Sequence, residues 1–219
     1  MYHQIFPMPP LFASTDNKSK LLIEYDLINM TENNVTQHLT NMQYIDGDQI
    51  KQIKQIKQIN PTLFINPPIK IFGKVARQRR SVGFFSDISQ GYKYSGQFLP
   101  SQPLPEWMNK ILLLVNKKFN TSFNAILINY YMNGNDYISA HSDDEQCLSD
   151  GYVATLSFGA ERTFVIRDKT TRYIEYKTIL PHNSLALMTG NFQKLYTHEI
   201  PKDKSLGPRW SLTFRYHKI

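Results

Sequence analysis

Short apolar runs separated by turn residues recur through the second half of the chain. Six such runs stand out, at 125–131, 152–158, 163–167, 173–178, 184–189 and 210–216. Strands of this length, spaced by turns, are typical of antiparallel sandwiches and barrels. The pattern therefore predicts a mainly β core, and the content of 13 Tyr and 13 Phe agrees with a strand-rich fold.

The first part of the chain is patterned differently. Residues 1–20 carry prolines and then polar residues, as in a tail, and 21–25 has the composition of a first strand. Thr31 is a candidate cap for a helix that runs from Glu32 into the forties. These features predict an N-terminal extension over residues 1–65 that contains a strand and helices.

Two further segments predict helices around the β core. The repeat KQIKQIKQI at 51–59 is expected to form an amphipathic surface helix or a low-complexity insert, with its lysines in water. Residues 105–119 have helical spacing, and the chain enters this helix through Pro105. We therefore expect an α+β fold, mainly β with flanking helices, in which residues 66–219 form the principal domain.

Charge and cysteine content narrow the class of protein. The net charge of +7 and the pI of about 9.3 favour a polyanionic partner, because Lys and Arg near phosphates release counterions; a merely basic soluble protein is an equal alternative. The single cysteine, Cys147, favours a reducing intracellular compartment, with nucleus and cytoplasm both open. The apolar run 111–115 is far shorter than the ~20 residues that a bilayer requires, and N-terminal prolines argue against a signal peptide. We expect no membrane association.

His141 and Asp143 lie two residues apart in a segment expected to be extended, so their side chains point the same way. Two His and one carboxylate on one face of a metal are typical of non-haem Fe(II) oxygenases. His198, between strand-like segments, is the favoured third ligand, whereas His182 follows a proline at a turn and is expected at the surface. The pair alone is weak evidence, because chance produces roughly 0.3 such pairs in a chain of this composition.

Polar and apolar residues alternate strictly near the C-terminus. Apolar side chains fall on one face of 209–216, and the other face carries Arg209, Ser211, Thr213 and Arg215. In an ordinary half-buried strand this polar face meets water. If it instead looks into the mouth of a barrel, the two arginines form a buried positive pair that needs an anion, and a small dicarboxylate suits their planar forks.

Two polar residues precede the His-x-Asp pair. Asn129 and Tyr131 share one face of their predicted strand. They can point into the same mouth as the polar C-terminal face, although such residues are more often satisfied barrel residues.

Together these motifs resemble the AlkB family of Fe(II)- and 2-oxoglutarate-dependent dioxygenases. The resemblance rests on His141-x-Asp143, His198 and the Arg209/Arg215 pair, within the segments NYYMNGNDYISAHSDDE, TLSFGAERTFVIR, SLALMTGNFQKLYTHEIP and PRWSLTFR. The order and spacing of these segments resemble the family over residues 69–219. The similarity is greatest to the nuclear homologues that repair double-stranded DNA.

The resemblance implies a double-stranded β-helix, or jelly-roll, core. His141, Asp143 and His198 would hold Fe(II) as the catalytic centre. The co-substrate 2-oxoglutarate would be bound by Asn129, Tyr131, Arg209, Ser211, Thr213 and Arg215, with Arg209 at the distal carboxylate and Arg215 near the metal-side carboxylate. Many members have Asn at the position of Ser211, which offers fewer hydrogen bonds, so a weaker affinity for 2-oxoglutarate is expected.

The resemblance also implies the reaction, in which O₂ and 2-oxoglutarate oxidise an alkyl group on a base nitrogen and release succinate and formaldehyde. A base in a duplex must be flipped out to be reached. Within the expected nucleotide-recognition region, residues 66–100, Tyr94 would stack on this base, Tyr92 would hydrogen-bond near it and Ser95 would flank it. Asp144 and Glu145 would favour a cationic base such as 1-methyladenine or 3-methylcytosine, or only orient the metal loop.

DNA contacts are expected in the same region. Phe72, Gly73 and Lys74 match a hairpin tip whose Phe wedges into the gap left by the flipped base, although a core Phe is the simpler reading. Arg80 takes the place of a DNA-contacting Arg. We therefore predict a monomer that repairs alkylated bases in double-stranded DNA. An RNA or single-strand demethylase, a catalytically silent nucleic-acid-binding module and a protein hydroxylase of the same fold stay open as alternatives.

Overall fold

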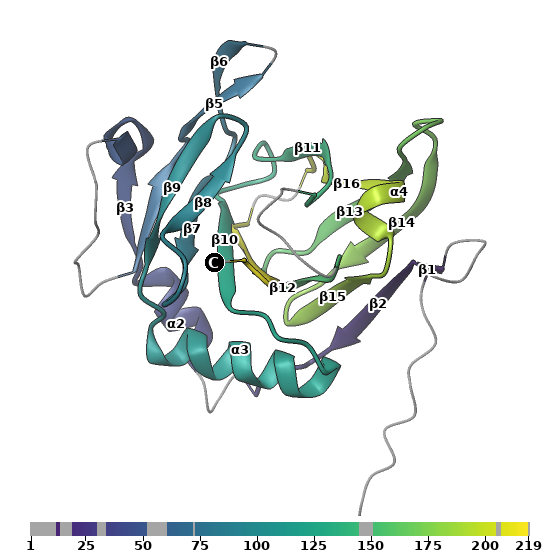
Figure 1. Ribbon diagram of the computed structural model, residues 1–219, viewed down its shortest axis with the longest axis horizontal. Helices are drawn as coiled ribbons and strands as arrows, with labels where there is room; N and C mark the ends of the chain where they lie inside the picture. Colours follow the sequence, from purple (N-terminus) through teal and green to yellow (C-terminus); the bar gives the residue numbers. More distant parts are fainter. Residues whose placement is uncertain are drawn as a thin grey trace, which may run out of the picture.

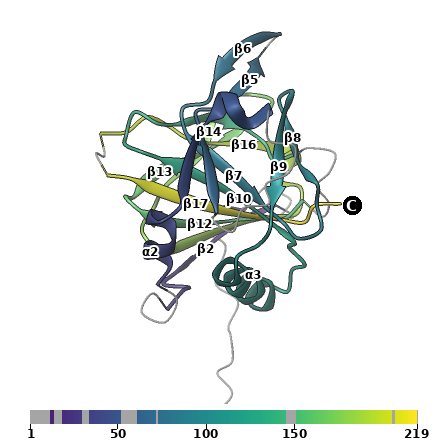
Figure 2. The ribbon, with the colours of Figure 1, turned by 90° about the vertical axis from the view of Figure 1, so that its left-hand side faces the viewer.

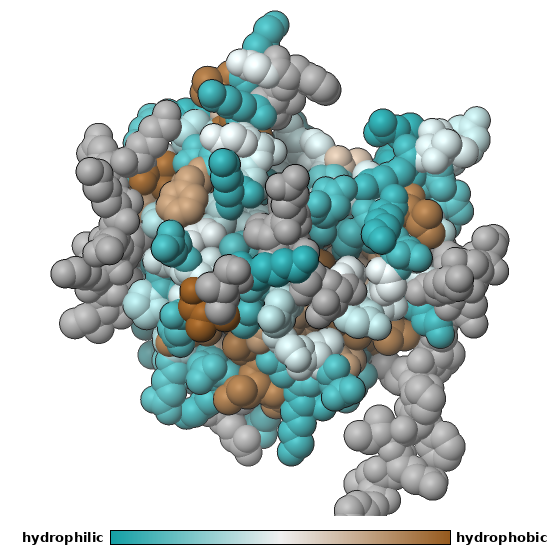
Figure 3. All heavy atoms as spheres, viewed as in Figure 1, coloured by the Kyte–Doolittle hydropathy of each residue, from teal (hydrophilic) through white to brown (hydrophobic). Residues whose placement is uncertain are grey.

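Two β-sheets face each other, with helices on the outside of the larger sheet (Figure 1). The computed structural model describes residues 12–13, 19–29, 34–51, 61–71, 73–144, 151–204 and 207–218. In this part of the chain, no helix has the length and apolar composition to cross a membrane. The face seen in Figure 3 is mostly hydrophilic, with hydrophobic residues in small separate groups.

The larger sheet contains strands from every part of the described chain. Its order is β1 (Phe12–Ala13), β2 (Lys20–Tyr25), β15 (Ser184–Thr189), β12 (Val153–Gly159), β17 (Arg209–Arg215), β10 (Ala125–Tyr131), β7 (Ser81–Phe85), β4 (Thr62–Ile65) and β3 (Gln43–Asp46). A branch beside β7 adds β9 (Gln97–Gln102) and β8 (Gly91–Tyr94). Neighbouring strands are antiparallel except for the pairs β3–β4 and β7–β9, which are parallel.

The smaller sheet covers the inner face of the larger one. Its order is β11 (Ile138–His141), β16 (Tyr196–Ile200), β13 (Arg162–Asp168) and β14 (Ile174–Leu180). The helices are α2 (Val35–Thr40), α3 (Glu106–Phe119) and the short α4 (Phe192–Leu195), with a 3-10 helix at Gly47–Lys51. Helix α3 lies at one end of the molecule, and the hairpin of β5 (Pro68–Ile71) and β6 (Lys74–Arg77) projects from the other (Figure 2).

Three central strands of the larger sheet send alternating side chains to opposite faces. Strands β10, β17 and β12 pair in register, so Ile128 and Leu212 lie side by side on one face, which packs against the apolar side of α3. Asn129, Ser211 and Ser157 lie side by side on the other face. All residues of β17 are buried, so its polar face does not meet water and instead lines a cavity between the sheets.

Most predicted elements are confirmed, with ends shifted by one or two residues. The helix predicted at 105–119 is α3, and the runs at 125–131 and 184–189 are β10 and β15. The prediction of a helix from Glu32 into the forties is wrong in extent, because α2 ends at Thr40 and the following residues form β3. Strand β3 gains backbone hydrogen bonds by pairing with β4, and this tertiary contact outweighs local helical preference. Residues 52–60, with most of the KQIKQIKQI repeat, lie outside the described residues.

Residues before position 66 take part in the larger sheet. Strand β2 pairs with β15 along its whole length, and β4 pairs with β7. The predicted division into an extension over 1–65 and a domain over 66–219 stays a prediction, but these strands share one hydrogen-bonded sheet with the principal domain.

The projecting hairpin is fixed at its base and turns at a glycine. The backbone N–H of Lys70 donates to the carbonyl of Ser95, 3.0 Å away in the turn between β8 and β9. Gly73 has φ +77°, a left-handed conformation that favours glycine. A Cβ added there would meet open space, so its conformation and not crowding favours glycine. Gly73 and Lys74 are exposed, as predicted for a hairpin tip, while Phe72 lies outside the described residues.

Candidate metal centre and its cavity

A cavity of about 720 Å³ opens between the two sheets. Its walls come from the polar face of β10 and β17, from β11 and β16 of the smaller sheet, and from β8 with the segment before β7. Ligand cavities in proteins have roughly 300–1,000 Å³, so this one has the size of an ordinary ligand-binding site.

Three predicted ligands meet on the wall formed by the smaller sheet. His141 ends β11 and pairs in register with His198 of β16, and Asp143 follows two residues later. Their ligand atoms all lie within 4.8 Å of one another. The Asp143 carboxylate oxygens are 3.8 Å from His141 Nε2 and 3.7 Å from His198 Nε2. Two imidazoles and one carboxylate thus surround one point, as a facial Fe(II) site requires.

The tautomer of His141 follows from its partner. Its Nδ1 lies 2.9 Å from the carbonyl oxygen of Ser139, which can only accept a hydrogen bond. Nδ1 therefore carries the proton, and the lone pair on Nε2 faces the other two ligands. The hydrogen bond from Nδ1 to Ser139 thus orients the imidazole so that Nε2 can bind a metal.

Burial and neighbouring charges set the protonation of the ligands. Burial lowers the pKa of His198 to about 3, reinforced by His141. Burial also lowers the pKa of His141. It would raise the pKa of Asp143, but Arg215, His198 and His141 outweigh it, so this pKa is lowered. At neutral pH the site presents two neutral imidazoles and a carboxylate, the forms that bind a metal.

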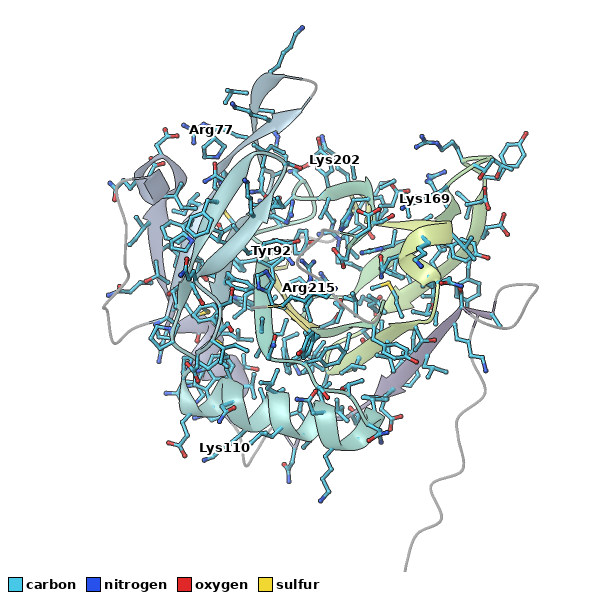
Figure 4. All side chains as sticks on the ribbon, in the orientation of Figure 1. Arg77, Tyr92, Lys110, Lys169, Lys202 and Arg215 are labelled. Carbon is cyan, nitrogen blue, oxygen red and sulfur yellow. The ribbon has the colours of Figure 1, made fainter. Side chains whose placement is uncertain are left out.

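Arg215 connects the carboxylate ligand to the aromatic side of the cavity. Its Nη2 donates to Asp143 Oδ1 at 2.6 Å, and its Nη1 donates to the hydroxyl of Tyr92. The guanidinium carbon lies 4.9 Å from the centroid of the Tyr92 ring. Tyr92 and Arg215 lie next to each other near the centre of the molecule (Figure 4). Asp143 therefore neutralises this arginine within the protein, without a ligand.

Arg209, the second arginine of β17, has no such partner. It is 1% exposed, its Nη2 donates to Ser157 Oγ at 2.9 Å, and its guanidinium carbon lies 5.2 Å from the Tyr131 ring centroid. Among the described residues, its buried Nε and Nη1 have no hydrogen-bond partner. Burial lowers the pKa of Arg209, which Tyr131 opposes and Arg162 reinforces. A buried, half-satisfied cation is costly, so a carboxylate in the cavity would stabilise it.

The remaining predicted co-substrate residues lie on the same floor of the cavity. Asn129 Oδ1 accepts a hydrogen bond from Arg80 Nε at 2.7 Å. Ser211 and Thr213 are buried and line the cavity on β17. Next to Arg209 in register is Gly159, with φ +91°, where a Cβ would lie 2.2 Å from the carbonyl oxygen of Pro208. Only glycine fits there without moving the start of β17.

Stacked aromatic rings form the opposite wall. The Tyr92 ring stacks on Tyr94 at 5.1 Å and on Phe84 at 5.5 Å between centroids. Gln78 Nε2 donates to the Tyr94 hydroxyl, which orients this outer ring. Tyr92 is 2% exposed whereas Tyr94 is half-buried, so Tyr94 presents more surface to the cavity. Tyr92, Tyr94 and the exposed Ser95 all line the cavity, and their role in binding a base stays a prediction.

These geometric features agree with comparisons to known proteins. The sequence profile of the 2OG-Fe(II) oxygenase superfamily matches residues 40–215. The chain belongs to this superfamily. Members of this superfamily use Fe(II), 2-oxoglutarate and O₂, and the residues of this chain fit these groups. The three ligand side chains are in metal-binding form, and Arg209 offers unsatisfied donors for a carboxylate.

Curated relatives confirm the resemblance to AlkB-type dioxygenases. "DNA oxidative demethylase ALKBH2" of Homo sapiens is 34% identical over 156 residues, which cover 67% of this chain and 60% of the relative. "Alpha-ketoglutarate-dependent dioxygenase alkB homolog 3" of Mus musculus is 39% identical over 151 residues, which cover 63% of this chain and 51% of the relative. The matched part of this oxygenase therefore spans between half and two thirds of the length of these relatives.

A solved structure confirms the predicted jelly-roll-like fold. The structure titled "The structure of OsALKBH1" superposes with a TM-score of 0.55 and covers 89% of this chain and 97% of that chain. The sequence identity is 15%, so this likeness concerns the fold alone. The chain thus has the same overall fold as that structure.

Some predicted site residues are placed differently from the others. Asp144 is exposed, and its Oδ2 accepts a hydrogen bond from Lys169 Nζ at 2.8 Å, so its charge is balanced by a neighbour. His182 is exposed as predicted, and its Nδ1 accepts from the backbone N–H of Gly159 at 3.0 Å. Glu145 lies outside the described residues.

The oxygenase site also contains residues that the sequence analysis missed. Ser157 and Thr155 of β12 face the polar positions of β17, and the alternation within TLSFG would have found them. Arg162 does not line the cavity but is buried next to it, 5.6 Å from the Tyr131 ring, and its Nη2 donates to the carbonyls of Asp136 and Pro201. No local signal marks Arg162, because its partners come from distant loops.

Proposed function

We propose that this oxygenase removes alkyl groups from damaged bases in nucleic acid, with double-stranded DNA as the preferred substrate. The observation that carries the proposal is the shared cavity: the metal ligands and the stacked tyrosines Tyr92 and Tyr94 line the same space. A base flipped into this space would have an aromatic ring to stack on and a reactive centre beside it. The name of the relative "DNA oxidative demethylase ALKBH2" supports the same substrate class.

The chemistry of the proposed reaction is an oxidation of the alkyl carbon. Fe(II) with 2-oxoglutarate and O₂ supplies a two-electron oxidation, in which 2-oxoglutarate loses CO₂ and becomes succinate. One oxygen atom of O₂ enters succinate and the other forms a hydroxyl on the carbon attached to the base nitrogen. The hydroxyl proton of this hemiaminal is then lost to solvent as its C–N bond breaks, which releases formaldehyde and leaves the electron pair of that bond on the ring nitrogen of the cationic base.

The chain's residues bind and orient the reactants. His141, Asp143 and His198 would hold Fe(II), and Arg215 keeps the Asp143 carboxylate in place and charged. Arg209 would pair with the distal carboxylate of 2-oxoglutarate through its unsatisfied donors. Asn129, Tyr131, Ser211 and Thr213 would complete the co-substrate site. The cavity lies between two sheets, which limits access of water to the reacting carbon.

A cationic lesion is the proposed substrate, of the 1-methyladenine or 3-methylcytosine type. Tyr94 and the His141 imidazole would contact the faces of the base, and an aromatic ring attracts a cation through its electron-rich face. Asp144 adds less than expected to this attraction, since Lys169 balances its charge. Selection would therefore depend more on the stacked rings than on Asp144.

Positive charges on both sides of the cavity fit a nucleic-acid backbone. Arg79 and Arg80 line it on one side, and on the other Lys202 Nζ lies 5.3 Å from the ring of Tyr137, which also lines the cavity. Figure 4 shows Arg77, Lys202 and Lys169 around the upper part of the molecule. Arg79, Arg80 and Lys202 would neutralise phosphates next to the flipped base, whereas Arg77 is paired with Asp48 and Lys169 with Asp144. This contribution should weaken with added salt.

The first experiment measures base restoration and formaldehyde release on a duplex with one 1-methyladenine. The same lesion is offered in single-stranded DNA and in RNA, each with Fe(II), ascorbate and 2-oxoglutarate. Turnover should require 2-oxoglutarate and disappear in a His141→Ala/Asp143→Ala variant. Faster turnover on single strands or RNA would reject the duplex preference, and no turnover on any strand with iron bound would reject base repair in favour of another substrate, such as a protein.

The duplex preference has its own test in the β5–β6 hairpin. Phe72→Ala should reduce duplex repair at least tenfold more than single-strand repair, because a wedge offsets an unstacking cost of about a few kcal/mol. Val75→Ala is the matched control, since Val75 is 73% exposed on the same hairpin. Equal losses on both substrates, or the same effect in the control, would remove the wedge.

A further inference from the structure

The short helix α4 packs beside the loop that carries Asp143. Phe192, the first residue of α4, is fully buried, and its ring lies 5.4 Å from that of Tyr196 between centroids. Tyr196 begins β16, the strand of His198. Helix α4 is therefore anchored to the strand of one metal ligand and can hold the loop of another.

Gln193 makes the contact between this helix and the loop. It is 3% exposed, and its Oε1 accepts a hydrogen bond from the backbone N–H of Asp143 at 2.9 Å. A backbone N–H only donates, so the oxygen of the amide must face Asp143. The Nε2 atom accordingly points to the Met188 Sδ, 3.5 Å away. Gln193 does not line the cavity and so does not reach 2-oxoglutarate or a base.

Neighbouring contacts hold the same loop. Ser142 Oγ donates to the carbonyl of Tyr196 at 2.9 Å. Lys169 Nζ donates both to the carbonyl of Gln193 and to Asp144 Oδ2, each at 2.8 Å. Ser142 is thus bonded to the start of β16 and Asp143 to α4, and Asp144 is connected to α4 through Lys169. The contact of Gln193 is the buried one, so its loss leaves a donor that water does not easily reach.

We propose that Gln193 is a positioning residue for the metal centre. Arg215 holds the carboxylate of Asp143 and Gln193 holds its main chain, so both ends of this ligand are fixed before a metal arrives. Ordering a loop on binding costs conformational entropy, and a loop that is already ordered does not incur that cost. Outer contacts of this kind typically change metal affinity 10- to 100-fold. The inference does not depend on which substrate the oxygenase repairs.

The test uses four proteins that differ at two adjacent positions. Gln193→Met keeps the size of the side chain but removes the acceptor, and Gln193→Glu keeps an acceptor oxygen. Lys194→Met is the matched control, because Lys194 is exposed on the same helix. Co(II) is titrated into each metal-free protein at 25 °C, and the visible d–d absorption gives both the dissociation constant and the coordination number. Circular dichroism checks that each metal-free variant is folded.

The expected order of affinities separates positioning from packing. Gln193→Met should bind Co(II) about 10- to 100-fold more weakly than wild type, with an altered d–d spectrum, while Gln193→Glu and Lys194→Met stay within about threefold. If Gln193 only fills space, Met is tolerated and Glu is not, and this order would overturn the proposal. Wild-type affinity in both Gln193 variants would also overturn it. If the Met variant does not fold, Gln193→Asn, whose amide is too short to reach Asp143, replaces it with the same expected loss.

Discussion

Arg209 offers the most informative test of how the cavity binds 2-oxoglutarate. Its guanidinium is buried, makes one hydrogen bond to Ser157 and keeps two donor nitrogens without partners among the described residues. Hydrogen bonds to charged groups contribute about 1.5–3 kcal/mol each, so a carboxylate that accepts two hydrogen bonds from one edge of the guanidinium gains roughly 3–6 kcal/mol. Arg209→Met should therefore weaken 2-oxoglutarate binding by about two to four powers of ten.

The same substitution should not destabilise the ligand-free protein. Methionine removes a buried cation whose desolvation is not repaid by a carboxylate, and the loss of the Ser157 bond and of packing on Tyr131 offsets part of that gain. The unfolding free energy of Arg209→Met should thus equal or exceed that of wild type. Arg162→Met is the contrasting control. The Nε and Nη1 of Arg162 also have no partner among the described residues, but Arg162 does not line the cavity, and its removal leaves two carbonyls that its Nη2 bonds to unpaired. That variant should lose stability but keep 2-oxoglutarate binding.

The assay is thermal unfolding with Mn(II) under anaerobic conditions, with and without 2-oxoglutarate. A ligand at 100 times its dissociation constant stabilises by about 2.7 kcal/mol, and a protein of this size gains about 2–4 °C per kcal/mol, so wild type should gain about 5–11 °C. At the same concentration Arg209→Met should gain about 1–2 °C or less. A variant that is destabilised without ligand yet keeps the full shift would refute the assignment of Arg209 to the distal carboxylate.

Three further predictions follow from contacts around the metal centre. Arg215 is expected near the metal-side carboxylate of 2-oxoglutarate, and Tyr92→Phe removes the hydroxyl that Arg215 donates to, so the KM for 2-oxoglutarate should rise about tenfold. A change confined to the KM for DNA would instead mean that Tyr92 contacts only the base. Lys169→Met releases Asp144 and should raise the ratio of kcat/KM for a cationic lesion over a neutral one about two- to fivefold, with stability lowered by less than about 1 kcal/mol; an unchanged ratio would place Asp144 away from the base. Acid should destabilise the metal-free protein, because the pKa of His198 is lowered to about 3 by burial. Its contribution is complete above the ordinary pKa of about 6.5 and is lost as pH falls toward 3, by up to about 1.4 kcal/mol per unit. Urea unfolding between pH 7 and 4 measures this slope, and His198→Asn should flatten it; an equal slope in the variant would contradict the assignment.

Much of the site could be predicted because strand periodicity places side chains. The alternation along 209–216 put four polar residues on one face, and the two-residue spacing of His141 and Asp143 aimed both at one point. Whether that polar face met water could not be predicted from β17 alone. The answer depends on the smaller sheet, whose strands come from elsewhere in the chain and close the cavity over it.

Pairings between residues that lie far apart in the chain could not be predicted from the sequence. The resemblance gave Arg209 and Arg215 to the two carboxylates of 2-oxoglutarate, but it did not show that Asp143 already pairs with Arg215 while Arg209 keeps donors without partners among the described residues. The resemblance left Asp144 to contact the base or to orient the metal loop, and only the structure shows that Asp144 lines the cavity and is paired with Lys169. An ion pair depends on three-dimensional distance, and residues 72 or 25 positions apart carry no mutual signal in a single chain.

Side-chain patterns along the chain are enough to assign the class of this protein: a β core, a His-x-Asp and a distant His as metal ligands, and a strand with a polar face that suits a dicarboxylate. These features are local, since each follows from side-chain chemistry and a period of two along one strand. The folded arrangement, in contrast, sets which charges are already neutralised, places α4 so that Gln193 holds the loop of Asp143, and brings the tyrosines and the metal ligands to one cavity. Those outcomes depend on how two sheets pack, and packing joins residues that the chain keeps far apart.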